Sequence, residues 1–283
     1  MMMDEVLFNS FLETALREDI GDGDHSSLSC IPSSSKGTAR LLIKDEGIIA
    51  GIDIAILIFR RIDPGLKLDL FLKDGVRVKN GDIAFTVSGK VLSILKSERL
   101  VLNVMQRMSG IATQTSQYVQ KLEGLKTRIL DTRKTTPGMR ILDKEAVRIG
   151  GGMNHRMGLY DMIMLKDNHI DFAGGIEKAI NKTSLYLKNE GKDLQIEIEA
   201  RSQEDVREIL RVGKIHRIML DNFSPAQTRQ AIELIAGRFE TESSGNITLE
   251  NLRDYAECGV DFISVGALTH QIRSLDFSLK AIQ

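Results

Sequence analysis

The stretch LQIEIEARSQEDVREILRVGKIHRIMLD (Leu194–Asp221) contains one unit of the pattern that decides the fold. An apolar run at its start is followed by residues with helical spacing and then by a second apolar run. The same alternation extends in both directions and gives six candidate strands: Arg128–Thr132, Asp161–Lys166, Leu194–Ala200, Arg217–Asp221, Phe239–Ser243 and Asp261–Val265. Parallel strands need crossover connections, so this order predicts a parallel sheet in an α/β protein. The last four strands end about 22 residues apart, which is typical of compact barrel units. We predict an incomplete (β/α) barrel with six strands rather than eight.

The residues before the barrel follow a different pattern. The first 22 residues have the spacing of an amphipathic helix, and Thr38–Lys44 and Leu66–Leu72 are predicted to be short strands. Asp74–Asp82 places a Val-x-Val strand between glycine turns. Ser97–Leu122 has helical spacing, with Ser97 as the expected N-cap and Gly110 as a weak point. We predict an N-terminal α+β sandwich domain over residues 1–107, a barrel domain over 108–269, and a C-terminal helix over 270–283 that packs on the first domain.

Composition excludes several classes of protein. The chain has 283 residues, of which 42% are hydrophobic and 27% are charged, as in ordinary globular proteins. Its formal net charge of −1 argues against a non-specific nucleic-acid binder or a membrane-surface protein. The longest apolar stretch, Gly47–Phe59, is shorter than the roughly 20 residues that a membrane span requires. The N-terminus lacks the pattern of a signal peptide, so we expect a cytoplasmic protein. Cys30 and Cys258 have no zinc-ligand spacing around them.

Polar residues follow each predicted barrel strand. In a barrel, the carboxyl ends of the strands meet at one mouth, where active sites lie. These strand ends are Asp131–Lys134, Lys166–His169, Glu199, Asp221–Asn222, Ser243–Asn246 and Ser264–Gly266. The stretch from Arg128 to Lys166 holds eight basic residues against four acidic ones. A basic cluster at the mouth suits a small polyanion, although each basic residue alone could belong to a solvated face.

The residue types at these ends indicate particular chemistry. Glu199 and Asp221 could face a divalent metal or stabilise a developing positive charge, or they could form ion pairs with neighbouring basic residues. The phrases SSGN (243–246) and SVGA (264–267) could cradle a phosphate or cap helices. The three glycines at 150–152 could form a helix cap and could also let the backbone approach a ligand. His155 and His169 could bond to an anion or serve the structure.

Longer motifs make a family resemblance specific. In the second half they are TRKTTPGMR (132–140), GGGMNHRMGLYDMIMLKDNHI (150–170), EIEA (197–200), MLDN (219–222), ESSGNI (242–247) and ISVGALTH (263–270). In the first half they are REDIGDGD (17–24) and SERLVLNVMQRMSGIAT (97–113). In order and spacing they resemble quinolinate phosphoribosyltransferase, also called carboxylating nicotinate-nucleotide pyrophosphorylase. The resemblance covers nearly the whole chain, with two small departures: a Ser at 26 or 27 where a Thr is more usual, and Asp131 where Glu is common.

The resemblance implies a decarboxylating pentosyltransferase. Quinolinate and phosphoribosyl diphosphate, with Mg²⁺, would give nicotinate mononucleotide, diphosphate and CO₂ for NAD synthesis. Lys134, Lys166, Glu199 and Asp221 would be catalytic, and Glu199 and Asp221 would lie by the ribose and the diphosphate-bound metal. The resemblance also implies a homodimer, with higher oligomers left open, in which Arg99 reaches the partner's site. The other substrate-binding residues would be Thr132, Arg133, His155, Arg156, Ser244, Gly245, Asn246, Val265, Gly266 and Ala267. Which of Lys134 and Lys166 faces the diphosphate stays open.

Other functions remain as alternatives. The barrel protein encoded with molybdate transporters shares the TRK and glycine phrases but usually lacks the ending at 166–169. Nicotinate phosphoribosyltransferase uses a phosphorylated histidine and a longer chain. A non-catalytic phosphate-binding protein would keep the SSGN and SVGA loops without needing the paired carboxylates. A metal-dependent barrel hydrolase is disfavoured because histidine ligands are not clustered in the sequence.

Overall fold

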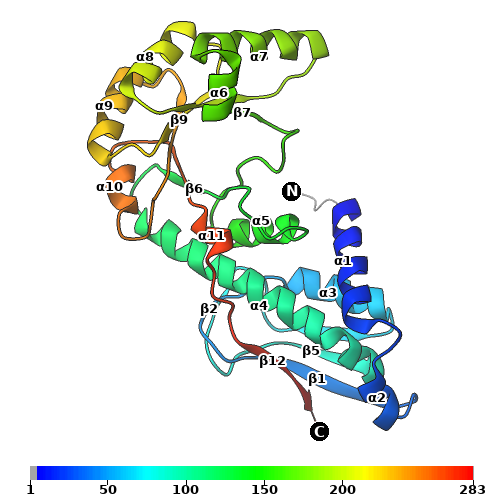
Figure 1. Ribbon diagram of the computed structural model, residues 1–283. Helices are drawn as coiled ribbons and strands as arrows, with labels where there is room; N and C mark the ends of the chain where they lie inside the picture. The colour runs from blue at the N-terminus through cyan, green and yellow to red at the C-terminus, as the bar shows by residue number, and fades with distance from the viewer. Residues whose placement is uncertain (1–4, 283) are drawn as a thin grey trace. The chain divides into compact units, whose positions relative to one another are not determined.

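The computed structural model describes residues 5–282, which form two compact units (Figure 1). Among these residues, the first unit contains 5–116, 135–151 and 268–282, and the second contains 117–134 and 152–267. The units are therefore interleaved along the sequence. Segment 135–151, which we expected in the barrel, belongs to the first unit. Within residues 5–282, no helix is both long and apolar enough to cross a membrane.

The first unit is built on a four-stranded antiparallel sheet with the strand order β12-β1-β5-β3. A separate two-stranded pair, β2 with β4, lies in the same unit. The strands are β1 (Lys36–Ile43), β2 (Gly47–Ile48), β3 (Lys67–Leu70), β4 (Arg77–Val78), β5 (Ile83–Lys90) and β12 (Phe277–Ile282). The helices are α1 (Glu5–Ile20), α2 (His25–Cys30), α3 (Ile52–Ile62), α5 (Arg140–Ile149), α11 (Ala267–His270) and most of α4 (Val91–Lys121).

Apolar side chains of the sheet and of α3 form the core of this unit. Leu41 and Ile43 of β1 are fully buried, as the alternation of a strand with one covered face predicts. Phe59 of α3 and Phe85 of β5 meet edge to face with ring centroids 5.9 Å apart. The strands predicted near residues 38–44, 66–72 and 76–78 are all present.

A buried ion pair joins α4 to α5. Arg107 donates to both carboxylate oxygens of Asp143 at 2.8 Å, and Asp143 is fully buried. The Asp143 carboxylate also accepts the N–H of Thr136, and Arg107 donates to the carbonyl of Thr269. These contacts connect the inserted segment and the C-terminal segment to the long helix of the same unit.

Three details of the predicted first half are wrong. The C-terminal segment is not a helix: Phe277–Ile282 forms β12, which pairs with β1 from Thr38↔Ile282 to Ile43↔Phe277. A strand forms because FSLKAI alternates at its start and because the edge of β1 offers unpaired backbone groups. Ser97 is not an N-cap, since α4 begins at Val91 and the Ser97 hydroxyl donates back to the carbonyl of Ser93. Gly110 does not weaken α4, because its missing side chain leaves room for the carbonyl of Arg273, 2.4 Å from where a Cβ would stand.

The second unit is an open barrel of six parallel strands. The strands are β6 (Arg128–Leu130), β7 (Ile163–Leu165), β8 (Ile196–Ala200), β9 (Arg217–Asp221), β10 (Glu240–Ser244) and β11 (Phe262–Ser264). Their order is β6-β11-β10-β9-β8-β7, so β6 and β7 stand at the two ends of the sheet and leave the barrel incomplete, as predicted. The helices of this unit are α6 (Asp167–Ala173), α7 (Ile176–Glu190), α8 (Gln203–Val212), α9 (Pro225–Ile235) and α10 (Leu252–Ala256). All six predicted strands are confirmed.

Candidate active site

Strand alternation gives the barrel a polar interior. In β8, Ile196, Ile198 and Ala200 occupy one face of the strand, and Glu197 and Glu199 occupy the other. The register pairs Glu197 with Arg217 and Arg217 with Glu240, so these neighbours share that inner face. Continuing this parity from β7 to β11, the inner positions are Met164, Lys166, Glu197, Glu199, Arg217, Met219, Asp221, Glu240, Glu242, Ser244, Phe262 and Ser264. The interior of the barrel therefore carries charged or polar groups from β8, β9, β10 and β11.

At the carboxyl ends of β7 and β8, Lys166 and Glu199 form an ion pair. The Lys166 ammonium contacts one oxygen of Glu199, and the other oxygen accepts the N–H of Asp167 at 3.1 Å. Lys166 also precedes α6, where its N–H bonds to the ring of His169. The ion-pair alternative for Glu199 and the structural alternative for His169 are therefore both observed. The pair holds a positive and a negative group side by side at the strand ends.

Asp221 follows at the end of β9 and is half-buried. Burial first, and then the negative charge of Glu199, raise the pKa of Asp221 above its ordinary value. Its carboxylate accepts the side-chain N–H of Asn222 at 2.8 Å, and Asn222 accepts from Asn246 at 3.2 Å. Two neighbouring carboxylates that repel each other are suited to attract a cation.

The loop after β10 is shaped by backbone conformations that few residues adopt. Gly245 has φ +92°, and a Cβ there would lie 2.2 Å from the side-chain oxygen of Asn222. Asn222 and Asn246 also have positive φ, which asparagine tolerates. At the matching end of β11, the N–H of Val265 bonds to the carbonyl of Leu130 and is used within the sheet. Val265 therefore lines this end of the barrel without offering its N–H to a ligand.

Cationic residues follow β6 and precede β7. Arg133 is exposed and Arg156 is half-buried, and across residues 5–282 no carboxylate forms an ion pair with Arg133. Burial first, and then the positive charge of Arg133, lower the pKa of Arg156. Lys134 is exposed in the same loop, where its N–H bonds to the Thr132 hydroxyl. Two guanidinium groups that repel each other form a place where an anion would be stabilised.

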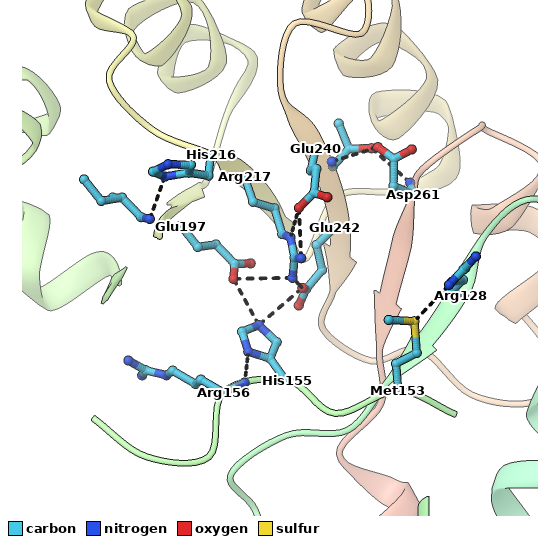
Figure 2. Close-up of polar contacts among 12 residues, drawn as sticks. Arg128, Met153, His155, Arg156, Glu197, His216, Arg217, Glu240, Glu242 and Asp261 are labelled. Atoms are coloured by element: carbon cyan, nitrogen blue, oxygen red, sulfur yellow. Dashed lines mark hydrogen bonds and ion pairs between the residues drawn. The ribbon is translucent and has the colours of Figure 1, made fainter. Parts of the chain in front are cut away.

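Below these groups lies a network of four buried charged residues, which we call the His155 network: His155, Glu197, Arg217 and Glu242 (Figure 2). The Nε2 atom of His155 is 3.0 Å from a Glu197 oxygen and 3.3 Å from a Glu242 oxygen. Arg217 donates to the same Glu242 oxygen at 3.2 Å and lies 3.9 Å from Glu197. The guanidinium also pairs with Glu240 and stacks on the ring of Phe262 at 4.1 Å. Each buried carboxylate thus has a cationic or N–H neighbour.

Both sides of the His155 ring are engaged. Burial lowers the pKa of His155, but the bonds to Glu197 and Glu242 outweigh burial and raise the pKa to about 9. The N–H of Arg156 points at Nδ1 over 2.7 Å, and that contact requires an unprotonated Nδ1. In the neutral ring this contact leaves the proton on Nε2, facing the two carboxylates. Burial first, and then the negative charge of Glu242, raise the pKa of Glu197 to about 7.

The predicted residues divide between the two units. Arg99 is exposed on α4 in the first unit, and the other predicted site residues lie in the second. Of the basic stretch that we expected at the mouth, Arg140, Lys144 and Arg148 lie on α5 in the first unit, and Arg128 begins β6 at the amino end of that strand. Gly150 caps α5, as one of the alternatives had it.

Sequence reasoning gave no role to Glu197, Arg217 and Glu242, and it named Asp131 only as one of the polar strand-end residues. Asp131 is fully buried and accepts the N–H of His155 at 2.8 Å and the side-chain amide of Asn154 at 2.7 Å. The available signal was two glutamates two residues apart within a predicted strand, which places both on the same face.

Two family models together match nearly the whole chain. The quinolinate phosphoribosyl transferase N-terminal domain matches residues 24–109, and the C-terminal domain matches residues 111–280. The chain belongs to the quinolinate phosphoribosyl transferase family. The fold is accordingly that of this family, with an antiparallel α+β unit and a parallel, barrel-like α/β unit.

Named relatives within the family are similar over most of their length. The chain is 45% identical to "Quinolinate phosphoribosyltransferase [decarboxylating] 1b" of Nicotiana tabacum, over 95% of this chain and 81% of that protein. It is 42% identical to the "Probable nicotinate-nucleotide pyrophosphorylase [carboxylating]" of Bacillus subtilis (strain 168), over 98% and 94%. The crystal structure of NadC from Streptococcus pyogenes superimposes with a TM-score of 0.93 at 38% identity, covering all of both chains.

Proposed function

We propose that this protein is a quinolinate phosphoribosyltransferase, a pentosyltransferase that joins quinolinate to phosphoribosyl diphosphate with loss of CO₂. The products are nicotinate mononucleotide, diphosphate and CO₂, which places the reaction in NAD synthesis. The observation that carries the proposal is membership of this family over the whole chain, together with the strand-end groups that such substrates require. Both substrates are polyanions, and the positive charges of Arg133 and Arg156 act on each other, while among residues 5–282 neither forms an ion pair with a carboxylate.

Quinolinate is proposed to bind at the cationic residues between β6 and β7. Arg133 and Arg156 offer planar, forked donors that match carboxylates, and Lys166 offers a point charge beside them. His155 directly precedes Arg156 in the sequence and would lie beside the same substrate. Thr132 orders the loop by accepting the N–H of Lys134. Lys134 would serve either quinolinate or the diphosphate.

Phosphoribosyl diphosphate is proposed to bind across the ends of β8 to β11. Glu199 and Asp221 would lie by the ribose, and the loops after β10 and β11 would surround the 5-phosphate. The positive φ of Gly245 and Asn246 turns the main chain there sharply, which is how a loop presents several N–H groups to an anion. The proposed cradle consists of Ser244, Gly245, Asn246, Val265, Gly266 and Ala267, with Val265 as a wall.

Mg²⁺ fits the donor set at Glu199 and Asp221. Carboxylate oxygens are the ligands that Mg²⁺ prefers, and the like charge of the two groups, which raises the pKa of Asp221, favours a cation between them. Two carboxylates leave most of the six ligand positions to substrate oxygens and water, so the ion would arrive with the diphosphate. Bound there, Mg²⁺ would neutralise charge on the departing diphosphate.

The residues then account for each chemical step. As the bond from ribose C1 to the diphosphate breaks, the carboxylates of Glu199 and Asp221 stabilise the oxocarbenium-like carbon. The pyridine nitrogen of quinolinate attacks this carbon and becomes positively charged. The carboxylate next to that nitrogen leaves as CO₂, the ring takes up the electron pair, and a proton from water replaces the lost group. Lys166, already paired with Glu199, orients one carboxylate of quinolinate toward the ribose.

We further propose a homodimer in which Arg99 completes the partner's site. Arg99 is exposed on α4, and no ion pair to it occurs among residues 5–282. A mixture of inactive Arg99→Ala and Lys134→Ala proteins should regain part of the activity after subunit exchange. Failure to regain activity, once exchange is verified, would contradict a shared site.

The cytoplasmic location expected from the N-terminal sequence stays a prediction.

A direct assay tests the reaction. Phosphoribosyl diphosphate and Mg²⁺ are supplied with either quinolinate or nicotinate, and diphosphate and CO₂ are both measured. We expect equal amounts of the two products with quinolinate and none with nicotinate. Diphosphate without CO₂, or turnover of nicotinate alone, would overturn the proposal, and ligand binding without turnover would favour a binding protein.

Two variants test the assigned roles. Lys134→Ala and Glu199→Gln each remove one partner of a charge contact, which typically costs 2 kcal/mol or more and should lower kcat/KM by roughly 30-fold. Lys188→Ala, an exposed lysine of α7, is the matched control and should retain the rate of the unaltered protein. Unaltered rates in both site variants would refute the assignment.

A further inference from the structure

The His155 network is more elaborate than packing requires. Burying two carboxylates, a guanidinium and an imidazole costs several kcal/mol per ion, and well-packed apolar residues would fill the same volume without that cost. Glu197 and Glu242 are completely buried, and His155 and Arg217 are 8% and 9% exposed. Such a cluster at the centre of a barrel calls for a role that apolar side chains could not perform.

Neighbouring residues contact both ring nitrogens of His155. Glu197 of β8 and Glu242 of β10 contact Nε2 of His155, and the N–H of Arg156 reaches Nδ1. The main-chain N–H of His155 is itself bonded to Asp131, at the end of β6. Three different strands therefore determine where the ring lies and which nitrogen carries the proton (Figure 2).

Arg217 in turn holds one of the two carboxylates. Its guanidinium bonds to Glu242 at 3.2 Å, pairs with Glu240 on the same strand, and stacks on Phe262. Because Glu242 is shared between Arg217 and His155, a guanidinium from β9 determines the position of a carboxylate that positions the imidazole. The chain of contacts ends at the backbone of Arg156, one of the residues proposed to grip quinolinate.

We propose that Glu197, Glu242 and Arg217 are positioning residues that hold the His155 ring and the adjacent Arg156 in the orientation that binds the pyridine dicarboxylate substrate. The inference rests on the proposed function. These three residues act through His155 and do not touch substrate. They set the affinity for the dicarboxylate and leave the affinity for phosphoribosyl diphosphate unaffected.

A buried metal ion is the competing interpretation. The ligand atoms of His155, Glu197 and Glu242 all lie within 4.8 Å of one another. However, the Arg217 guanidinium already approaches both carboxylates, so a cation is present where a metal would have to balance charge. The positive charges of Arg217 and His155 therefore stand where a metal ion would otherwise balance the two carboxylates. Metal content of the purified protein tests this point, and we expect no metal that survives dialysis against a chelator.

The decisive experiment is a double-mutant cycle on KM. Glu242→Gln keeps the size of the side chain and removes its charge, and it should raise KM for quinolinate about 10-fold while KM for phosphoribosyl diphosphate changes less than about 2-fold. In a His155→Ala background the same substitution should add less than about 2-fold, because the residue through which it acts is gone. A merely structural role would alter both KM values or kcat.

Glu240→Gln is the matched control. Glu240 lies on the same strand and pairs with the same guanidinium, but its side chain is half exposed and does not contact His155. It should leave both KM values unchanged. Should Glu242→Gln fail to fold, Glu197→Gln removes the other carboxylate contact to Nε2 and should give the same split.

The outcomes separate the two proposals. Absence of quinolinate turnover in the unaltered protein overturns the proposed function and this inference with it. If turnover is normal, three results would overturn the inference alone. These are equal effects of Glu240→Gln and Glu242→Gln, additive effects in the cycle, or a stoichiometric metal that is lost in Glu242→Gln.

Discussion

Replacing Gly245 by alanine tests the loop after β10, which forms part of the proposed phosphate cradle. The residue has φ +92°, where a side chain costs roughly 1 to 2 kcal/mol. In addition, the new Cβ would stand 2.2 Å from the side-chain oxygen of Asn222 and 3.0 Å from its backbone nitrogen, so Asn222 must turn away. That movement breaks the bonds of Asn222 to Asp221 and Asn246, at about 1 kcal/mol each. The expected loss of stability is therefore about 3 to 4 kcal/mol.

Gly237→Ala separates the two costs. Gly237 has φ +72° in the same unit, and a Cβ there meets no atom within 4 Å, so only the backbone penalty applies. Thermal denaturation should show a fall in Tm about two to three times larger for Gly245→Ala than for Gly237→Ala. KM for phosphoribosyl diphosphate should rise about 10-fold or more in Gly245→Ala alone, since the carboxylate of Asp221 loses its hydrogen bond from Asn222. Equal Tm shifts, or an unchanged KM, would refute the link between this glycine and the Asn222 contacts.

Two further predictions concern the first unit. Asp143→Asn leaves the partly buried Arg107 without its counter-charge and should cost about 3 kcal/mol in urea denaturation, whereas a loss below about 1 kcal/mol would show that the pair contributes little. Asp74 accepts the N–H of Ile52, and burial raises the pKa of Asp74 to about 6 from 3.8. Its protonated form favours folding, so this stabilising contribution is complete below pH 4 and is lost as pH rises through 6. In urea denaturation, Asp74→Asn should therefore gain free energy of unfolding over the unaltered protein progressively between pH 4.5 and 6.5, and the gain should level off above that at no more than about 3 kcal/mol; a difference independent of pH would contradict the shifted pKa.

The barrel was predictable because its strands and helices have different periods. Most strands from β6 to β11 are short and contain apolar residues next to a helical segment, and the polar residues that end them are adjacent in sequence. Residues such as Lys166, Glu199 and Asp221 could thus be placed at one end of the sheet from the sequence alone.

The rest depends on contacts between distant segments. The alternation at the start of FSLKAI is too short to decide between a strand and a helix, and the open edge of β1 decides it. Likewise, Glu197 and Glu242 each look out of place in a buried strand until Arg217 and His155 are beside them. Hydrophobic patterning treats buried positions as apolar, so it cannot find charges whose burial is made possible by partners elsewhere in the chain.

The pairing of β12 with β1 has a consequence for synthesis on the ribosome. Residues 36–43 emerge early, but the strand that covers their edge is among the last residues of the described chain to be made. The six barrel strands all lie between them in sequence and can pair first. Until β12 emerges, the nascent chain carries a strand with open hydrogen-bonding groups, which is a site for mispairing with other chains. A protein stopped short of residue 277 should therefore depend on chaperones far more than its small loss of length suggests.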